Sequence, residues 1–331
     1  MKKMPRKIEI SYRTIVFTAF FLILLWLLFQ IRQILIGLFI AVVLMAAINP
    51  VIDRMERFKI PRLLGILLIY VLIFVLFGVI VGGVVPPLID QTRTLVIRLP
   101  EYIEGISVPI FGQRLIDFQF SQLGSLPTNL VKISFSIFSN FLSGLLILVI
   151  TLYLLLERKN LNRYLHVLFG GDGEVKAEKL IKEIESQLGG WVRAEMTLMV
   201  IIAAMTYVGL RLLGIDFALP LALLAGLLEV FPNFGPALSS IPAILAGLAV
   251  SPIMALAVAA LYFLIQQIEN IFVVPQVMSR EAGVNPLVTI VALAVGFSLA
   301  GIIGAVLAVP VVLMAKVIAS EVFASDRFKH L

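Results

Sequence analysis

Long apolar runs recur along the whole chain and are separated by short polar segments. They lie at Thr14–Phe29, Ile34–Ile48, Leu63–Leu88, Ile133–Leu156, Met196–Leu213, Phe217–Phe231, Ala237–Val250, Ile253–Val274 and Pro286–Val317. A helix that crosses the hydrocarbon core of a bilayer needs about 20 apolar residues, and several of these runs are near that length. The pattern predicts an all-α fold, a polytopic transmembrane helical bundle, with broken or re-entrant helical hairpins in its C-terminal half.

Composition strengthens this prediction and excludes several classes of protein. Of the 331 residues, 61% are hydrophobic and only 14% are charged, a balance that two water-soluble domains would not show. The chain has no cysteine, and its two histidines, His166 and His330, lie far apart, so neither a metal site nor a redox centre is expected. Motifs for binding nucleotides or for metalloproteolysis are also missing. We therefore expect a protein that is not an enzyme and has no catalytic residues.

Basic residues predict how the chain crosses the membrane, because cytoplasmic loops carry an excess of Lys and Arg. They gather before residue 14, in Asp53–Arg62 and in Glu157–Glu195. These segments, with both termini, are expected in the cytoplasm, and the net charge of +6 reflects these flanks and not a nucleic-acid partner. The predicted organisation is three N-terminal spans (1–89), an extracytoplasmic amphipathic cap (90–132), one span (133–156), a cytoplasmic amphipathic helix segment (157–195), a transport core with broken helices (196–318) and a cytoplasmic tail (319–331).

Apolar residues recur at helical spacing through Glu174–Glu195. Two pairs of opposite charges lie four residues apart on this segment, Glu178 with Lys182 and Lys179 with Glu183, and such pairs stabilise a helix. We favour a helix that lies on the bilayer or on its own bundle over one that binds a regulator.

The apolar runs Phe217–Phe231 and Ala237–Val250 are each about fifteen residues long, too short to cross the hydrocarbon core as ordinary helices. They are separated by the sequence Phe231-Pro-Asn-Phe-Gly-Pro236. Because proline lacks an amide hydrogen and clashes with the preceding turn, this sequence cannot continue a helix. Two short helices must meet at an irregular tip. They are either two full crossings or a re-entrant hairpin whose tip reaches the bilayer interior.

The last apolar run, Pro286–Val317, poses the reverse problem. As one helix it would measure about 48 Å, well beyond a hydrocarbon core of about 30 Å. We expect it to break within Gly296–Gly304, where glycines and Ser298 weaken the helix. Small residues also recur at every fourth position, which favours close helix packing, and they are Ala292, Gly296, Ala300, Gly304 and Ala308.

Polar side chains inside these apolar runs are the candidate binding residues. Glu229 precedes the first tip, and four more polar residues cluster in the run Ile253–Val274, namely Gln266, Gln267, Glu269 and Asn270. Because a carboxylate that faced lipid would be costly, Glu229 and Glu269 should face a cavity, Arg211 or each other. The alternative is that Glu269 and the amides cap a helix end near Pro275 at the membrane interface.

Several motifs of the C-terminal half together resemble the autoinducer-2 exporter family of bacterial membrane proteins, and the resemblance covers nearly the whole chain. The motifs are Glu229-Val-Phe-Pro-Asn-Phe-Gly-Pro236, Leu261-Tyr-Phe-Leu-Ile-Gln-Gln-Ile-Glu-Asn270, Val274-Pro-Gln-Val-Met278, Asn285-Pro-Leu287 and Gly301-Ile-Ile-Gly-Ala-Val-Leu-Ala-Val-Pro310. Where the family usually has Ile-Pro-x-x-Gly-Pro, this chain has Phe231, and where it usually has His-Pro, this chain has Asn285. The second departure removes a titratable group.

The resemblance implies a secondary transporter of the bacterial inner membrane that assembles as a homo-oligomer, for example a pentamer. Members have been assigned export of autoinducer-2, and others exchange of sodium or lithium for protons. Our leading hypothesis is alternating-access export of a small polar solute, with a Na⁺(Li⁺)/H⁺ antiporter as the alternative and a passive oligomeric channel or a membrane scaffold as readings from other classes. Na⁺ or H⁺ would be the coupling ion, with no other cofactor.

The hypothesis assigns two sets of residues. The solute or ion would be bound by Glu229, Asn233, Gln266, Gln267, Glu269 and Asn270. The hairpin tips and helix breaks would be formed by Pro232, Gly235, Pro236, Pro275, Pro286, Gly296, Ser298, Gly301, Gly304 and Pro310.

Overall fold

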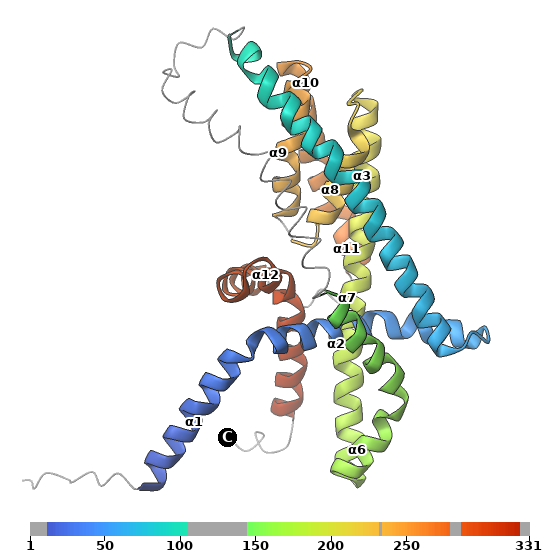
Figure 1. Ribbon diagram of the computed structural model, residues 1–331, viewed down its shortest axis with the longest axis vertical. Coiled ribbons are helices and arrows are strands. Elements are labelled where there is room, and N and C mark those ends of the chain that lie inside the picture. The colour runs from blue at the N-terminus through green and yellow to red at the C-terminus, as the bar shows by residue number, and fades with distance from the viewer. Residues whose placement is uncertain (1–11, 105–143, 232–233, 279–285, 325–331) are drawn as a thin grey trace, which may run out of the picture.

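A computed structural model describes residues 12–104, 144–231, 234–278 and 286–324, and this part of the chain is almost entirely helical (Figure 1). Its helices are α1 (Tyr12–Gln30), α2 (Arg32–Arg57), α3 (Arg62–Glu104), the short η1 (Arg158–Asn160), α6 (Leu161–Phe169), α7 (Gly171–Leu212), α8 (Ala218–Leu228), α9 (Gly235–Leu248), α10 (Pro252–Ile268), the π-helical turn η2 (Glu269–Val273), α11 (Val274–Val277) and α12 (Pro286–Ala324). Residues 144–157 are also helical.

Six helical segments in the described residues are long and apolar enough to cross a membrane. They are Tyr12–Gln30, Arg32–Arg57, Arg62–Gly83, Gly171–Leu212, Pro252–Val277 and Leu287–Glu321. The prediction of an all-α, polytopic membrane protein is thereby confirmed. Apolar side chains remain exposed over most of these helices, and α1 buries none of its residues, as expected for helices that face lipid.

Helix boundaries differ from the predicted domain boundaries at three places. α3 continues beyond residue 89 to Glu104, α7 joins the predicted cytoplasmic segment to the following span without a break, and α12 continues beyond residue 318 to Ala324. The remainder of the predicted cap lies outside the described residues. The assignment of these segments to the two sides of the membrane stays a prediction.

The core of the bundle lies between α7, α8, α9 and α10. Its buried apolar residues come from all four helices and include Leu210, Leu221, Ala243 and Val258. The helices approach closely because glycines face their neighbours: a Cβ atom at Gly226 would lie 2.5 Å from the backbone oxygen of Met199. A second apolar cluster joins α2, α3 and residues 144–157.

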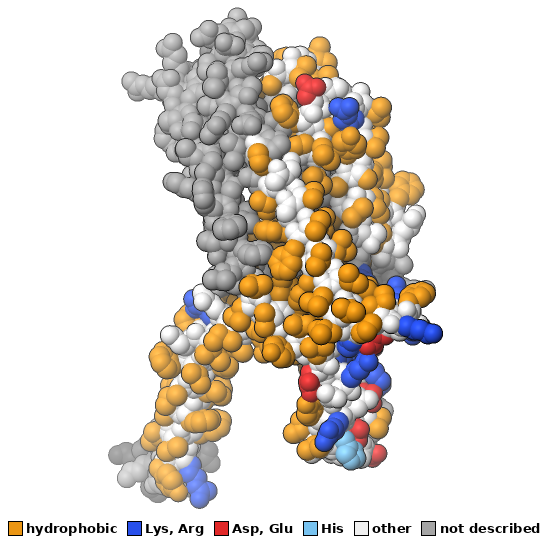
Figure 2. All heavy atoms as spheres, turned by 45° about the vertical axis from the view of Figure 1, so that its right-hand side comes forward, with side chains coloured by type: hydrophobic (Ala, Val, Ile, Leu, Met, Phe, Trp, Pro, Cys, Tyr) orange, Lys and Arg blue, Asp and Glu red, His pale blue; other side chains and the backbone are white. Residues whose placement is uncertain are grey.

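α6 and the N-terminal half of α7 form a charged arm that extends from the apolar bundle. Figure 2 shows charged side chains gathered on this arm, below a body whose surface is mostly hydrophobic. Arg158, in η1 directly before α6, links this end of the arm to α7, since its guanidinium donates to both carboxylate oxygens of Glu185 at 2.6 and 2.7 Å. The predicted pair Glu178–Lys182 also forms, with the Lys182 Nζ 2.6 Å from the carboxylate.

Candidate functional site

The first predicted break lies between α8 and α9. Glu229 follows the last residue of α8, and the backbone then turns so that the Gly235 amide donates to the Phe231 carbonyl at 2.8 Å. Only glycine fits at position 235, because a Cβ atom there would lie 2.0 Å from the carbonyl oxygen of Leu228. Pro236 is buried in the first turn of α9, where its missing amide hydrogen is not needed. Pro232 and Asn233 lie outside the described residues.

The second predicted break lies inside α12. Ala300 has φ −141° and Gly301 has φ 60° and ψ −143°, so two helical arms, 286–300 and 301–324, meet at Gly301. The arms cross in contact, since a Cβ atom at Gly304 would lie 2.0 Å from the Gly296 carbonyl oxygen. The break thus falls within the predicted Gly296–Gly304 interval, and the small residues pack one arm against the other.

Other residues assigned to the breaks occupy ordinary helical positions. Pro286 is the first residue of α12, Ser298 is exposed on its first arm, and Pro310 is buried within its second arm without ending it. Pro275 is exposed in the first turn of α11, directly after η2. The wider π-helical turn lets the chain pass a proline that has no amide hydrogen to donate.

The two breaks lie next to each other in space. Phe231, at the tip of the α8–α9 hairpin, packs against a buried cluster formed by both arms of α12, which contains Leu293, Ala305 and Ala308. The second arm of α12 also packs on α7, where Trp191 contacts Leu313. Both irregular elements therefore adjoin the middle of α7.

Three buried glutamates lie at this meeting point, and each comes from a different element. Glu195 on α7, Glu229 at the end of α8 and Glu269 at the start of η2 are 4%, 3% and 3% exposed. The carboxyl groups of Glu229 and Glu269 lie within hydrogen-bonding reach of each other, and Glu195 lies close enough to Glu269 for electrostatic repulsion. Gln266 donates its amide to Glu269 Oε2 at 3.2 Å.

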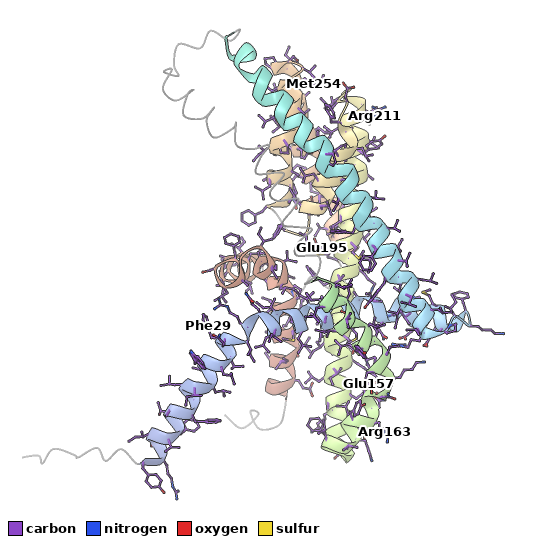
Figure 3. The ribbon with its side chains drawn as sticks, in the orientation of Figure 1. Phe29, Glu157, Arg163, Glu195, Arg211 and Met254 are labelled. Carbon is purple, nitrogen blue, oxygen red and sulfur yellow. The ribbon has the colours of Figure 1, made fainter. Side chains whose placement is uncertain are left out.

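These carboxyl groups have no cationic partner among the described residues. The Oε2 atoms of Glu195 and Glu229 are buried without a hydrogen-bond partner. Arg211, one of the predicted partners, is exposed near one end of the bundle, whereas Glu195 lies near its middle (Figure 3). Within the part of the chain that the structure describes, no group of three or more acidic or histidine side chains is arranged as a metal site. Two carboxyl groups can hydrogen-bond only when one carries a proton, so the Glu229–Glu269 pair is suited to holding a proton.

The structure brings together only part of the predicted binding set. Glu229, Glu269 and Gln266 converge, while Gln267 and Asn270 are exposed on another face of the helix. Of the two interpretations of Glu269, the structure favours the buried site over the helix cap, because the helix continues through η2 into α11.

Glu195 was missed because the sequence interpretation placed it at the end of a cytoplasmic helix. A signal was present in the residue spacing. Along the uninterrupted α7, the buried positions Leu188, Trp191, Glu195, Leu198, Ile202, Thr206 and Gly209 recur every three or four residues. Glu195 therefore occupies a core position of the helix.

Comparison with known proteins supports the resemblance noted in the sequence. The family described as AI-2E family transporter matches residues 15–324. The chain is 26% identical to the "Putative transport protein YrrI" of Bacillus subtilis over 91% of both chains. It is 28% identical to the AI-2 transport protein TqsA of Escherichia coli over 85% of this chain and 83% of that protein. With six membrane-length helices and a match that covers nearly its whole length, the chain belongs to the AI-2E transporter family and is a multi-pass membrane transport protein.

Proposed function

We propose that this protein is a secondary transporter that exports a small polar solute across the bacterial inner membrane and exchanges it for protons. The observation that carries the proposal is the buried Glu229–Glu269 pair, which lies between two broken helical elements and has Glu195 beside it. A carboxyl pair that can share a proton supplies a coupling site, and irregular backbone next to it supplies groups that can bind a hydroxylated solute.

The lengths of the helices support re-entrant hairpins over full crossings. α8 has 11 residues and α9 has 14, which correspond to about 16 and 21 Å and fall short of a hydrocarbon core of about 30 Å. With the charged α6–α7 arm in the cytoplasm, the α8–α9 hairpin enters from outside and the tip at Phe231 meets α12 at membrane depth. Alternating access would then result from movement of these hairpins against α7.

The name of the relative TqsA supports a solute similar to autoinducer-2. The proposal leaves Gln267 and Asn270 as secondary binding residues, which a second subunit of a homo-oligomer or a movement of the hairpins would bring toward the solute.

The proposal is tested by transport in proteoliposomes that contain the full chain. With autoinducer-2 inside and an imposed proton gradient, Glu269→Gln should abolish proton-driven efflux, because glutamine cannot take up and release a proton. Glu183→Gln, on the exposed face of α7, serves as the matched control and should transport normally. Unchanged proton-driven efflux in Glu269→Gln would refute the coupling role.

A Na⁺(Li⁺)/H⁺ antiporter is the second candidate. It is favoured by the unpartnered carboxylate oxygens of Glu195 and Glu229, since oxygen atoms are the ligands that small hard cations prefer. Uptake of ²²Na⁺ driven by an outward proton gradient, without any response to autoinducer-2, would select this candidate. Non-saturating flux would instead indicate a passive channel, and normal growth of a Glu229→Ala, Glu269→Ala double variant with stable protein would indicate a scaffold.

A further inference from the structure

Two buried hydroxyl groups lie on α7 and α10, the helices that carry or lead into two of the buried glutamates. Across the described residues, four buried side-chain oxygen atoms have no hydrogen-bond partner, and all four belong to α7, α10 or the end of α8. They are Glu195 Oε2, Glu229 Oε2, Thr206 Oγ and the Tyr262 hydroxyl oxygen. Thr206 is 1% exposed and Tyr262 is 6% exposed.

The same residue types are satisfied elsewhere in the protein. Thr151, fully buried, donates to the carbonyl of Ile147 one turn earlier at 2.8 Å. Tyr70, also buried, donates to the carbonyl of Leu148 at 2.6 Å. Because a buried hydroxyl without a partner costs free energy, the chain normally supplies an acceptor, and Thr206 and Tyr262 differ from Thr151 and Tyr70 in having no protein partner among the described residues.

Helix geometry aligns these hydroxyls with the carboxyl groups. Thr206 follows Glu195 by three helical turns, about 16 Å, on the same face of α7. Tyr262 on α10 precedes Glu269, the first residue of η2, by two turns, about 10 Å, and lies on the same face of this continuous helical segment. The two helices run in opposite directions, since Arg211 near the end of α7 and Met254 near the start of α10 lie at the same end of the bundle (Figure 3) and Gly209 faces Leu261. The hydroxyls therefore lie toward that end and the carboxyl groups toward the middle.

We propose that Thr206 and Tyr262 line a hydrated route along the α7–α10 interface by which protons reach the Glu229–Glu269 pair from the Arg211 end of the bundle. The inference rests on the proposed function and adds the path to the coupling site. A hydroxyl can accept a hydrogen bond from one water while donating to the next, so a proton moves along the chain and every group regains its original number of protons. Ile202 on α7 and Ile265 on α10, buried in the same apolar cluster as Tyr262, lie between the hydroxyls and the carboxyl groups along the two helices.

Cysteine labelling tests whether water reaches the route without any knowledge of the solute. The chain has no native cysteine, so Thr206→Cys introduces a single thiol of similar size. The thiolate, which forms in water but not in an apolar core, attacks the sulfenyl sulfur of a methanethiosulfonate reagent, so that a mixed disulfide forms and methanesulfinate leaves. We expect Thr206→Cys to react about tenfold or more faster than the control Leu210→Cys, which lies one turn later and is 0% exposed. Equal, slow reaction of both variants would overturn the hydrated route.

Transport rates test whether the route carries protons. Tyr262→Phe and Thr206→Val keep the shape of the side chains and remove the hydroxyls, and each should slow proton-driven efflux of autoinducer-2, or proton-driven ²²Na⁺ uptake, by about tenfold. The controls are Tyr207→Phe and Thr197→Val, exposed residues of α7, which should match the wild type.

The two proposals fail in different ways. If Glu269→Gln abolishes proton coupling while Tyr262→Phe and Thr206→Val behave like their controls, the route is overturned and the coupling site stands. If Thr206→Cys reacts rapidly and both hydroxyl variants are slow while Glu269→Gln couples normally, the route stands and the Glu229–Glu269 pair is not its end point.

Discussion

Two regions of this protein use the same residue in opposite ways. On the α6–α7 arm, glutamates have partners: Glu185 has Arg158, Glu178 has Lys182, and Glu174 lies 2.8 Å from His166. In the bundle, Glu195, Glu229 and Glu269 are buried deeper than any of these, yet the described residues supply them with no cation.

Under the proposed function, the difference separates structural carboxylates from functional ones. On the arm, the Arg158–Glu185 pair links η1 to α7, and a paired carboxylate gains from being charged. A buried carboxyl group without a cation makes the fold less stable, and such groups cluster at sites that bind or transfer protons and ions. The lack of partners therefore marks the site more clearly than the presence of acidic residues does.

The largest effect is expected when the buried region loses one carboxyl group. Glu195→Gln should reduce proton-coupled transport on the order of a hundredfold, as for loss of a group that transfers protons. The thermal unfolding temperature should stay the same or rise, because a neutral amide is cheaper to bury than an unpaired carboxyl group. Transport in proteoliposomes and thermal unfolding in detergent measure the two quantities. A large fall in unfolding temperature would mean that Glu195 belongs with the structural carboxylates.

An intermediate effect is expected when the arm loses a cation. Arg158→Ala leaves the half-buried Glu185 without its two hydrogen bonds and should lower the free energy of unfolding by about 1–3 kcal/mol. Transport per folded molecule should be retained. Lys182→Ala is the control, since its ion pair with Glu178 is exposed to solvent and should contribute much less. Equal effects of the two substitutions on thermal unfolding would contradict the role given to Arg158.

The smallest effect is a change in the titration of an exposed group. Glu157, just beyond the predicted span 133–156, accepts hydrogen bonds from Tyr164 and Asn160, which lower the pKa of its carboxyl group. The resulting stabilisation is present above the pKa of the unfolded chain and is lost as the pH falls through the lowered pKa. Tyr164→Phe should raise the Glu157 pKa toward its ordinary value. NMR titration of carboxyl-labelled protein measures this shift, and Tyr153→Phe, which removes another exposed tyrosine, should leave it unchanged.

The fold could be predicted from the sequence where local chemistry dictates it. Prolines and Gly235 enforce the α8–α9 tip, and Gly301 permits the break in α12, so both interruptions were evident from residue types alone. Helix ends without such residues were not predictable. α7 passes from charged arm to apolar bundle without a proline, and Gly189 does not interrupt the helix because it packs against the backbone of α2.

The site was predictable only in part, for a similar reason. Glu229 and Glu269 stand out because apolar residues surround them in sequence, whereas Glu195 has Arg193 two residues before it and resembles a surface residue. The sequence also grouped Gln266 with Gln267 and Asn270. Neighbouring positions on a helix point about 100° apart, and contacts with other helices decide which of them faces the interior.

The close contact between α7 and α2 gives α7 a point about which its two ends could tilt in opposite directions. At Gly189 the two backbones nearly touch, since a Cβ atom there would lie 2.2 Å from the Ala46 carbonyl oxygen, and this contact can serve as a fulcrum. The arm extends about 27 Å to one side of Gly189, and Glu195 lies about 9 Å to the other. A sideways displacement of about 3 Å at the tip of the arm would thus become about 1 Å at Glu195, enough to make or break a hydrogen bond. One uninterrupted helix thus links the charged arm mechanically to the glutamates of the proposed coupling site.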